Sequence, residues 1–217
     1  MKNIAKQNVA FLLPYLIFLS AAGIFLTANS KADAHLILNQ YRANFLDYFF
    51  YYMTFLGDFT TVLVLTIILC FIRFRYALLM MTSNILSALI TQLLKHTLFS
   101  DYVRPVKFFE GIHQLNLVPW YDNYYYNSFP SGHSTSAFTT FFCIALITKN
   151  RMIKLLMFFI ALTVGLSRVY LSQHFLNDVF AGSLIGVVCS FAVYKLFFLS
   201  SNTESNGWMD RSLLKLK

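Results

Sequence analysis

The chain of 217 residues is 58% hydrophobic and only 12% charged. Soluble domains are about 45–50% apolar and about 25% charged, and disordered chains are poor in aromatic residues, whereas 18% of this chain is aromatic. The composition therefore excludes a soluble globular domain and a disordered protein. The basic residues behind the net charge of +8 are scattered rather than gathered on one face, so we expect no nucleic-acid partner.

Six apolar stretches reach the length of about 20 residues that a helix needs to cross a bilayer. We predict an all-α integral membrane bundle of six transmembrane helices in one domain. The predicted spans cover approximately residues 9–27, 49–71, 76–99, 131–148, 152–171 and 175–199. Between the first two, Leu36–Phe50 is expected to form a short helix along the interface. We expect residues 200–217 to be a solvated cytoplasmic tail that touches the inner leaflet through Trp208 and Leu213–Leu216.

The first stretch has two readings. Lys2 and Lys6 precede an apolar run and small residues follow it, which is the pattern of a secretory signal peptide. The run of about 19 residues is longer than the roughly 7–15 residues of a signal peptide's apolar region. The length favours a helix that is retained over one that is cleaved.

The orientation is predicted from lysine and arginine, which are enriched in cytoplasmic connections. Six of the 17 basic residues fall on one side: Lys31, Arg42, Lys95, Arg104, Lys107 and Arg168. The other eleven fall on the opposite side: Lys2, Lys6, Arg73, Arg75, Lys149, Arg151, Lys154, Lys195, Arg211, Lys215 and Lys217. We therefore expect both termini inside and the long 100–130 connection outside.

A histidine and an aspartate stand four residues apart where the sixth span begins. His174 and Asp178 therefore share one helical face. A carboxylate that accepts a hydrogen bond from one imidazole nitrogen fixes the tautomer and leaves the other nitrogen as a nucleophile or base. The same spacing also suits a structural polar pair in the headgroup zone, and both interpretations stay open at this point.

The tetrapeptide from Pro130 to His133 opens the fourth span. Proline and Ser131 are typical of a helix start, and Gly132 lets backbone N–H groups approach a ligand closely. A helix N-terminus favours anions. Simple capping, with His133 as an interfacial residue, is the alternative.

Three cations lie on the outer side, where the positive-inside rule does not expect them. Arg104 and Arg168 carry guanidinium groups that match phosphate oxygens, and Lys95 adds a point charge. Polar residues at steps of three and four place Lys95 on a face that points into the bundle: Asn84, Ser87 and Thr91. Snorkelling to the interface explains one such cation more easily than three.

Together these residues resemble the signature of the type 2 phosphatidic acid phosphatases, membrane lipid phosphatases related to bacterial acid phosphatases and vanadium haloperoxidases. Pro-Ser-Gly-His at 130–133 matches the second motif. Ser167-Arg168, five residues, His174, three residues and Asp178 match the third. The first motif of that family has six residues between lysine and Arg-Pro, whereas eight separate Lys95 from Arg104 here.

The resemblance implies a mechanism in which His174 attacks phosphorus to form a phosphohistidine and Asp178 orients it. His133 would protonate the leaving alkoxide, and water would then hydrolyse the intermediate. The implied phosphate-binding groups are Lys95, Arg104, Ser131, Gly132 and Arg168. Because the motifs contain few acidic ligands, we expect no metal and no other cofactor.

Other features are less specific. Asp58, in the second span, is a functional or a hydrogen-bonded structural carboxylate. The Gly182, Gly186 and Ser190 repeat predicts close helix packing. The aromatic segment 120–126 predicts an interfacial belt or a lipid entrance. The three cysteines lie in apolar runs without metal-ligand spacing, and we expect buried hydrophobic roles for Cys70, Cys143 and Cys189.

The sequence predicts metal-independent hydrolysis of a phosphomonoester or diphosphate on a membrane lipid, at the outer face of a bacterial inner membrane. Undecaprenyl diphosphate, phosphatidate, phosphatidylglycerophosphate and the phosphates of lipid A all remain candidate substrates. A lipid phosphotransferase that uses the same intermediate is one alternative. A non-enzymatic anion or lipid transporter is the other, although it does not need this set of histidines and aspartate.

Overall fold

The computed structural model describes residues 4–199 and 207–215, and over these ranges it contains helices and no strand. In chain order the helices are α1 (Ile4–Gln7), α2 (Val9–Ala28), α3 (Lys31–Asn39), α4 (Asn44–Thr54), η1 (Phe55–Gly57), α5 (Phe59–Ile72), α6 (Phe74–Thr97), α7 (Pro105–Phe108), α8 (Gly132–Ile147), α9 (Arg151–Tyr170), α10 (Leu176–Leu199), η2 (Trp208–Asp210) and η3 (Leu213–Lys215). The all-α prediction is confirmed.

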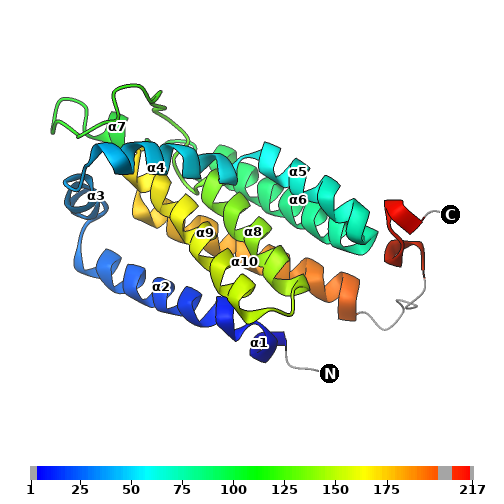
Figure 1. The fold of residues 1–217 in the computed structure, drawn as a ribbon. Coiled ribbons are helices and arrows are strands. Elements are labelled where there is room, and N and C mark those ends of the chain that lie inside the picture. Colours follow the sequence, from blue (N-terminus) through cyan, green and yellow to red (C-terminus); the bar gives the residue numbers. More distant parts are fainter. Residues whose placement is uncertain (1–3, 200–206, 216–217) are drawn as a thin grey trace.

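Helix α8 lies at the centre of the bundle and packs against α6, α9 and α10 (Figure 1). Its contact with α10 depends on glycine, because a Cβ at Gly182 would come within 2.6 Å of the Ser131 carbonyl and one at Gly186 within 2.6 Å of the Thr135 carbonyl. Ser190 Oγ donates to the Thr139 carbonyl at 3.1 Å. The predicted close packing of this small-residue repeat is confirmed.

The polar stripe on α6 faces α8. Hydroxyl contacts join Thr91 to Thr135 at 3.3 Å and Ser87 to Thr139 at 3.0 Å. The carboxamide oxygen of Asn84 accepts from a further α8 hydroxyl at 3.2 Å. These pairs satisfy the hydrogen bonds of polar groups inside the apolar bundle. They also fix the rotation of α6 about its axis, so that Lys95 in its last turn points into the bundle.

Four helices in the described part of the chain are long and apolar enough to cross a membrane, namely α2, α6, α9 and α10. A fifth crossing results if α4 with η1 and α5 count as one span, although these halves are bent by 56°. Helix α8 is apolar but has only 16 residues. Membrane-spanning helices are thus confirmed, while the number six stays a prediction.

The predicted span over 49–71 is not one continuous helix, because the chain is extended at Asp58 with φ −80° and ψ 157°. Gly57 lies so close to α8 and α9 that a Cβ there would meet Val164 at 2.8 Å and the His133 carbonyl at 3.0 Å. This close approach bends the chain toward the start of α8. The apolar run in the sequence carries no sign of it apart from the Gly-Asp pair.

Helix α2 contributes side chains to the main core. Phe11 is fully buried and its ring lies 4.8 Å from that of Phe142 on α8. The hydroxyl of Tyr15 lies 3.3 Å from Ser183 Oγ on α10. These contacts make α2 part of the packed bundle, and its retention stays a prediction.

Two further expectations need correction. The predicted interfacial helix over 36–50 is two helices, α3 and α4, because the chain leaves helical geometry between Asn39 and Asn44. The tail is not simply solvated, since Asp210 pairs with Arg73 and Arg75 at 2.8 and 2.7 Å and the Phe74 amide donates to the Arg211 carbonyl. Leu216 lies outside the described residues.

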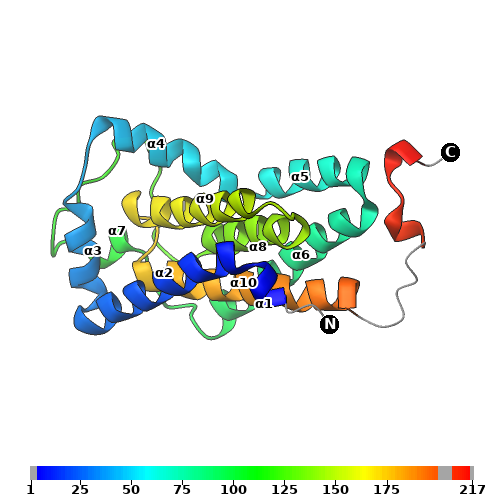
Figure 2. The ribbon, with the colours of Figure 1, turned by 60° about the horizontal axis from the view of Figure 1, so that its bottom comes forward.

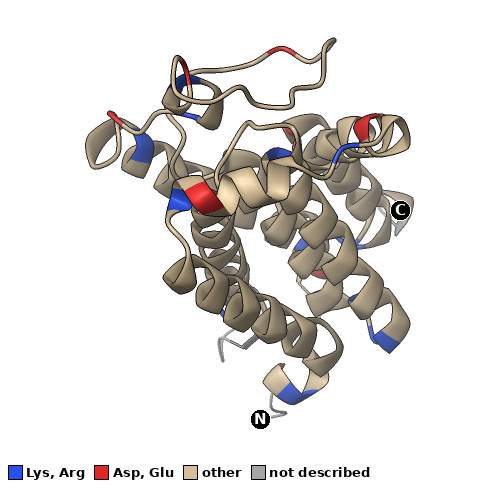
Figure 3. Cartoon of the chain, turned by 90° about the vertical axis from the view of Figure 1, so that its left-hand side faces the viewer, with Lys and Arg blue, Asp and Glu red and all other residues tan. Residues whose placement is uncertain are grey.

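Different short helices lie at the two ends of the bundle. Helices α3 and α7 lie at one end, and α1 with the segment η2–η3 lies at the other (Figure 2). Viewed from the α3 and α7 end, charged positions lie mostly on connections and helix ends, and the bundle between them is largely uncharged (Figure 3). All three cysteines are free; Cys143 and Cys189 are buried as predicted, whereas Cys70 is only half-buried.

Candidate active site

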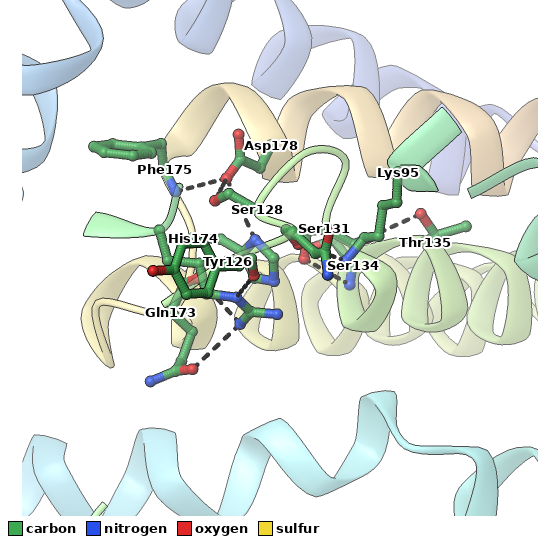
Figure 4. A network of polar contacts seen from close by, with 12 residues as sticks. Lys95, Tyr126, Ser128, Ser131, Ser134, Thr135, Gln173, His174, Phe175 and Asp178 are labelled. Carbon is green, nitrogen blue, oxygen red and sulfur yellow. Dashed lines mark hydrogen bonds and ion pairs between the residues drawn. The ribbon is translucent and has the colours of Figure 1, made fainter. Parts of the chain in front are cut away.

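The predicted site residues converge at the α3 and α7 end of the bundle. They come from the last turn of α6, the connection that follows it, the start of α8, the end of α9 and the turn into α10. Figure 4 shows the core of this group, with Lys95, Ser131, His174 and Asp178 turned toward one region.

The pair of His174 and Asp178 is formed as predicted. His174 Nδ1 lies 3.3 Å from Asp178 Oδ2, and both side chains are almost fully buried. The same carboxylate oxygen accepts from the Phe175 amide at 3.0 Å and from the Ser128 hydroxyl at 2.5 Å. Because Asp178 occupies Nδ1, the nitrogen available to react is Nε2.

The turn that carries His174 is held by backbone hydrogen bonds. Helix α9 ends at Tyr170, Ser172 adopts a left-handed conformation with φ 52°, and the amides of Gln173 and His174 both donate to the Arg168 carbonyl. This turn therefore fixes the histidine and the arginine of the third motif relative to each other.

Burial and positive charge keep the His174 imidazole neutral. Desolvation, and then the nearby charges of Arg104, Lys95, Arg168 and His133, lower the pKa of His174 well below its usual range. A lowered histidine pKa means that the free base persists at neutral pH, so the lone pair of Nε2 is available.

Lys95 and Arg104 hold neighbouring carbonyls. Lys95 Nζ donates to the Asn127 carbonyl at 3.0 Å, and Arg104 Nε donates to the Tyr126 carbonyl at 2.8 Å. Lys95 is only 7% exposed, so it does not snorkel to the surface. The two extra residues of the first motif fall within the turn that follows α6, where the Phe99 amide donates a hydrogen bond to the Leu94 carbonyl.

Two arginines complete the positive cluster. Arg104 Nη1 also donates to both oxygens of Gln173 at 3.3 Å, and burial next to Arg168 lowers the pKa of Arg104 to about 10, which leaves it charged at neutral pH. Arg168 Nη1 donates to Thr54 Oγ1 at 2.6 Å and to the Tyr121 hydroxyl at 2.9 Å. Arg168 Nε is buried and has no hydrogen-bond partner among the described residues.

Ser131 and Gly132 form the start of α8. Ser131 Oγ accepts from the Ser134 amide at 3.3 Å, and the Ser131 amide donates to the Asp178 carbonyl at 3.0 Å, which ties α8 to α10. A Cβ at Gly132 would project into open space. The helix terminus is therefore capped as predicted, and the glycine leaves room beside it for a bound group.

His133 pairs with Asp58, a contact that the sequence left open. Its Nε2 lies 2.7 Å from Asp58 Oδ1, and both side chains are about one-third exposed. Asp58 stands at the N-cap of α5 but makes no capping hydrogen bond. The carboxylate is turned toward the histidine instead of toward the helix that follows it.

A cavity of about 300 Å³ extends from this pair between α5, α6 and α8. Asp58, Gly132 and His133 lie on its wall together with the polar residues Ser87 and Thr91. The rest of the wall is mainly apolar and includes Phe59, Val62, Ile85 and Ala88. The cavity is thus a partly apolar groove that begins at a histidine of the site.

Sequence reasoning missed several side chains that contact the predicted site residues, among them Thr54, Tyr121, Ser128 and Gln173. Gln173 directly precedes His174, and Tyr121 lies in the aromatic segment 120–126, so weak signals existed for these two. No signal in the sequence pointed to Thr54 or Ser128.

His35, to which the sequence assigned no role, is buried, and its Nε2 lies 3.3 Å from Ser172 Oγ in the turn before His174.

The described residues include no group of three or more histidine, cysteine, aspartate or glutamate side chains that could hold a metal ion. That the reaction needs no metal stays a prediction, which the EDTA experiment described below tests.

Comparison with known proteins agrees with this arrangement of helices and motifs. A family model described as the PAP2 superfamily matches residues 76–201, more than half of the chain. The chain therefore belongs to the PAP2 superfamily, and the predicted resemblance to the type 2 phosphatidic acid phosphatases is confirmed. By this membership it is an integral membrane protein of the type 2 phosphatidic acid phosphatase kind.

Two solved structures share the fold. The crystal structure of Aquifex aeolicus LpxE has a TM-score of 0.67 and 29% identity, covering 75% of this chain and 93% of that one. The crystal structure described as that of the first transmembrane PAP2 type phosphatidylglycerolphosphate phosphatase, from Bacillus subtilis, has a TM-score of 0.65 to this chain. The two sequences are 25% identical, and the match covers 91% of this chain and 99% of that one.

Similar sequences include lipid phosphatases. Lipid A 4′-phosphatase of Porphyromonas gingivalis is 27% identical over 77% of this chain and 72% of its own length. Phosphatidylglycerophosphatase B of Bacillus subtilis is 39% identical over 30% of this chain. The second match spans only 37% of that relative's length.

Proposed function

We propose that this protein hydrolyses a phosphomonoester or diphosphate on a membrane lipid, without a metal, through a phosphohistidine on His174. The observation that carries the proposal is the buried imidazole of His174, held on Asp178 and surrounded by three cations. Such a site combines a neutral nucleophile with charges that stabilise a phosphoryl group.

In the first step, His174 Nε2 attacks phosphorus in line and the bond from phosphorus to the leaving oxygen breaks. His133 supplies a proton to that oxygen, and Asp178 stabilises the imidazolium that forms. In the second step, water attacks the phosphohistidine, His133 takes a proton from the water, and inorganic phosphate leaves. Both steps gain mainly from positioning and charge stabilisation.

The three non-bridging oxygens would be bound by Lys95, Arg104, Arg168, the Ser131 hydroxyl and the Gly132 amide. The unpartnered Nε of Arg168 supports this assignment, since a buried donor without a partner costs free energy that a phosphoryl oxygen would recover. Tyr121 and Thr54 then act as positioning residues that hold the other side of the Arg168 guanidinium.

Asp58 is assigned as the positioning residue of His133. A carboxylate 2.7 Å from an imidazole nitrogen favours the protonated ring. It therefore fixes the orientation of the ring and stabilises the imidazolium form from which His133 would donate to the leaving group.

A lipid substrate is supported by the groove between α5, α6 and α8, whose apolar wall suits the hydrocarbon of a lipid that reaches the site from the bilayer. The names of the similar proteins point to lipid A and phosphatidylglycerophosphate as substrates of those proteins. For this chain we retain these two, phosphatidate and undecaprenyl diphosphate as candidates.

For the membrane arrangement we propose a single domain with six spans, in which α4 to α5 is a bent span and α8 a short one. Both termini would lie in the cytoplasm of a bacterium and the site would face the outside of its inner membrane. The excess of basic residues at the end opposite the site supports this orientation.

A lipid phosphotransferase is the second candidate, because an alcohol in place of water would capture the same phosphohistidine. A transporter of anions or lipids is disfavoured, since it has no use for the buried pair of His174 and Asp178.

The test is phosphate release by the purified protein from a panel of lipid phosphates in the presence of EDTA. We expect release from at least one lipid, and the same rate when Mg²⁺ replaces EDTA. Activity that EDTA abolishes and Mg²⁺ restores would contradict the metal-free site. Release that requires an added acceptor alcohol would identify a phosphotransferase.

A further inference from the structure

A second concave site lies at the end of the bundle opposite the catalytic residues. It is a cavity of about 580 Å³ between α1, the start of α6, the connection from α8 to α9 and the last turns of α10. Five basic residues line it, Lys6, Arg73, Lys149, Arg151 and Lys154, and no aspartate or glutamate is among its described lining residues. We call this cavity the basic pocket.

The positive charge of the basic pocket is only partly balanced by the protein. Arg73 pairs with Asp210 at 2.8 Å, but Asp210 is shared with Arg75. Within residues 4–199 and 207–215, no carboxylate lies in ion-pair distance of Lys149, Arg151 or Lys154.

Lys154 is the most informative member. It is 3% exposed, and its Nζ lies 2.5 Å from the side-chain oxygen of Asn8, a neutral partner. A buried ammonium without a counter-charge is costly. The positive-inside rule accounts for basic residues in exposed connections, but it does not account for a buried lysine in the wall of a cavity.

One wall of the basic pocket is aromatic. The rings of Tyr194 and Phe198 are stacked at 4.6 Å, Tyr76 stacks on Phe198 at 6.1 Å, and the Arg73 guanidinium lies 5.5 Å from the Tyr76 ring. Leu146 and Ile147 extend this apolar surface. Cations beside aromatic and aliphatic groups suit a ligand that is anionic at one end and apolar at the other.

We propose that the basic pocket binds the phosphate headgroup of an anionic membrane phospholipid. The lysine and arginine side chains would bind the phosphate, and the aromatic wall would contact the glycerol and the first part of the acyl chains. Because the pocket lies at the far end of the bundle, this site is separate from the catalytic site and does not depend on the reaction proposed there.

The test is lipid binding by the purified full chain, measured by native mass spectrometry with phosphatidylglycerol, phosphatidylcholine or inorganic phosphate. We expect bound phosphatidylglycerol in preference to phosphatidylcholine. A basic residue near a membrane surface contributes about 1 kcal/mol to binding an anionic lipid, so the double variant K149Q/R151Q should bind phosphatidylglycerol about 30-fold more weakly.

The matched control is K195Q/R211Q, which removes two positive charges outside the basic pocket and should bind phosphatidylglycerol as the wild type does. Lys154→Met should weaken binding as K149Q/R151Q does, and an unchanged Tm in detergent verifies that each variant is folded. Should K149Q/R151Q turn out unfolded, the charge-preserving K149R and R151K are compared with K149Q and R151Q singly.

Equal loss in both double variants would overturn the proposal, because it would indicate attraction by net charge alone. Equal binding of phosphatidylcholine would overturn it as well. If inorganic phosphate binds as tightly as the lipid and displaces it, the pocket is a phosphate site and the lipid assignment is wrong.

Discussion

Nε2 of His133 lies 2.7 Å from Oδ1 of Asp58, across the bend that separates α4 and η1 from α5. The bend brings a carboxylate from the second apolar stretch to the histidine at the start of α8. Asp58 thereby gives up the capping hydrogen bond that its position would allow. We interpret the bend as the feature that places Asp58 beside the proposed acid.

The first prediction concerns this pair. Asp58→Asn should lower kcat on a lipid phosphate about tenfold, less than the loss of about 10²–10⁴ expected for His133→Ala, because the histidine remains but is less well held and less readily protonated. The measurement is kcat on a lipid phosphate, with kcat/KM on that lipid and on an aryl phosphate, because kcat/KM reports the first step. Since a good leaving group needs no proton, kcat/KM of both variants should fall much less on the aryl ester, whereas hydrolysis of the phosphohistidine still needs His133.

Asp101→Asn, which alters an exposed carboxylate outside the site, is the control and should behave as the wild type on both substrates. A loss for Asp58→Asn that is the same on both substrates would assign Asp58 a purely structural role.

The second prediction tests the lengthened first motif. Lys95→Ala should lower kcat about 10²–10³-fold, the usual cost of losing one preorganised electrostatic donor. Lys95→Arg should recover little, because a planar guanidinium does not replace a compact ammonium. Arg104→Ala and Arg168→Ala are the comparison variants, because they show how far kcat falls when an arginine of the site is lost. Near-wild-type turnover of Lys95→Ala beside two inactive arginine variants would leave a site with two arginines.

The third prediction concerns stability and pH. Burial lowers the pKa of His35 from its usual 6.5 to about 4. Between these values the unfolded chain binds a proton that the folded chain does not, so the folded state loses stability as the pH falls. One pKa unit corresponds to about 1.4 kcal/mol, so the loss from neutral pH to about pH 4 should be on the order of 2–3 kcal/mol.

The measurement is Tm in detergent as a function of pH. His35→Phe should remove part of the decline, whereas His113→Gln, at an exposed histidine, should keep the wild-type slope. Parallel curves for the wild type and His35→Phe would contradict a neutral, buried His35 beside the turn that carries His174.

The fourth prediction concerns sidedness. Ile112→Cys, in the connection over the site, should react with a membrane-impermeant thiol reagent added to intact cells, because residue 112 is 75% exposed. Arg211→Cys should react only after the membrane is opened. The wild type, whose own cysteines are buried or half-buried, is the blank. The reverse labelling pattern would place the site in the cytoplasm and direct the search to inner-leaflet lipids.

Local patterns in the sequence predicted much of the fold. Helix bounds follow from apolar length, and the inward position of Lys95 follows from the spacing of Asn84, Ser87 and Thr91. The contact of His174 with Asp178 follows from the helical spacing of four. All of these features depend on residues that are near one another in the chain, where helical geometry determines which side chains share a face.

The remaining features depend on contacts between distant segments. The bend at Asp58 arises because Gly57 packs against Val164 and His133, and the apolar run of the second stretch does not encode that contact. Tyr121 reaches Arg168 from a connection without regular structure, whose path no periodicity specifies. The binding of Asp210 to Arg73 and Arg75 likewise joins the tail to a distant helix start.

Phosphorylation of His174 is the step on which the proposed reaction depends. The most direct measurement is mass spectrometry, under alkaline conditions that preserve phosphohistidine, of protein that is quenched during turnover of a lipid phosphate. We expect an acid-labile mass increase of one phosphoryl group on the peptide that contains His174. This increase should be absent in His174→Ala and should accumulate in His133→Ala on an aryl phosphate. A wild-type enzyme that turns over with no label on His174, or a His174→Ala variant with near-normal phosphate release, would contradict it.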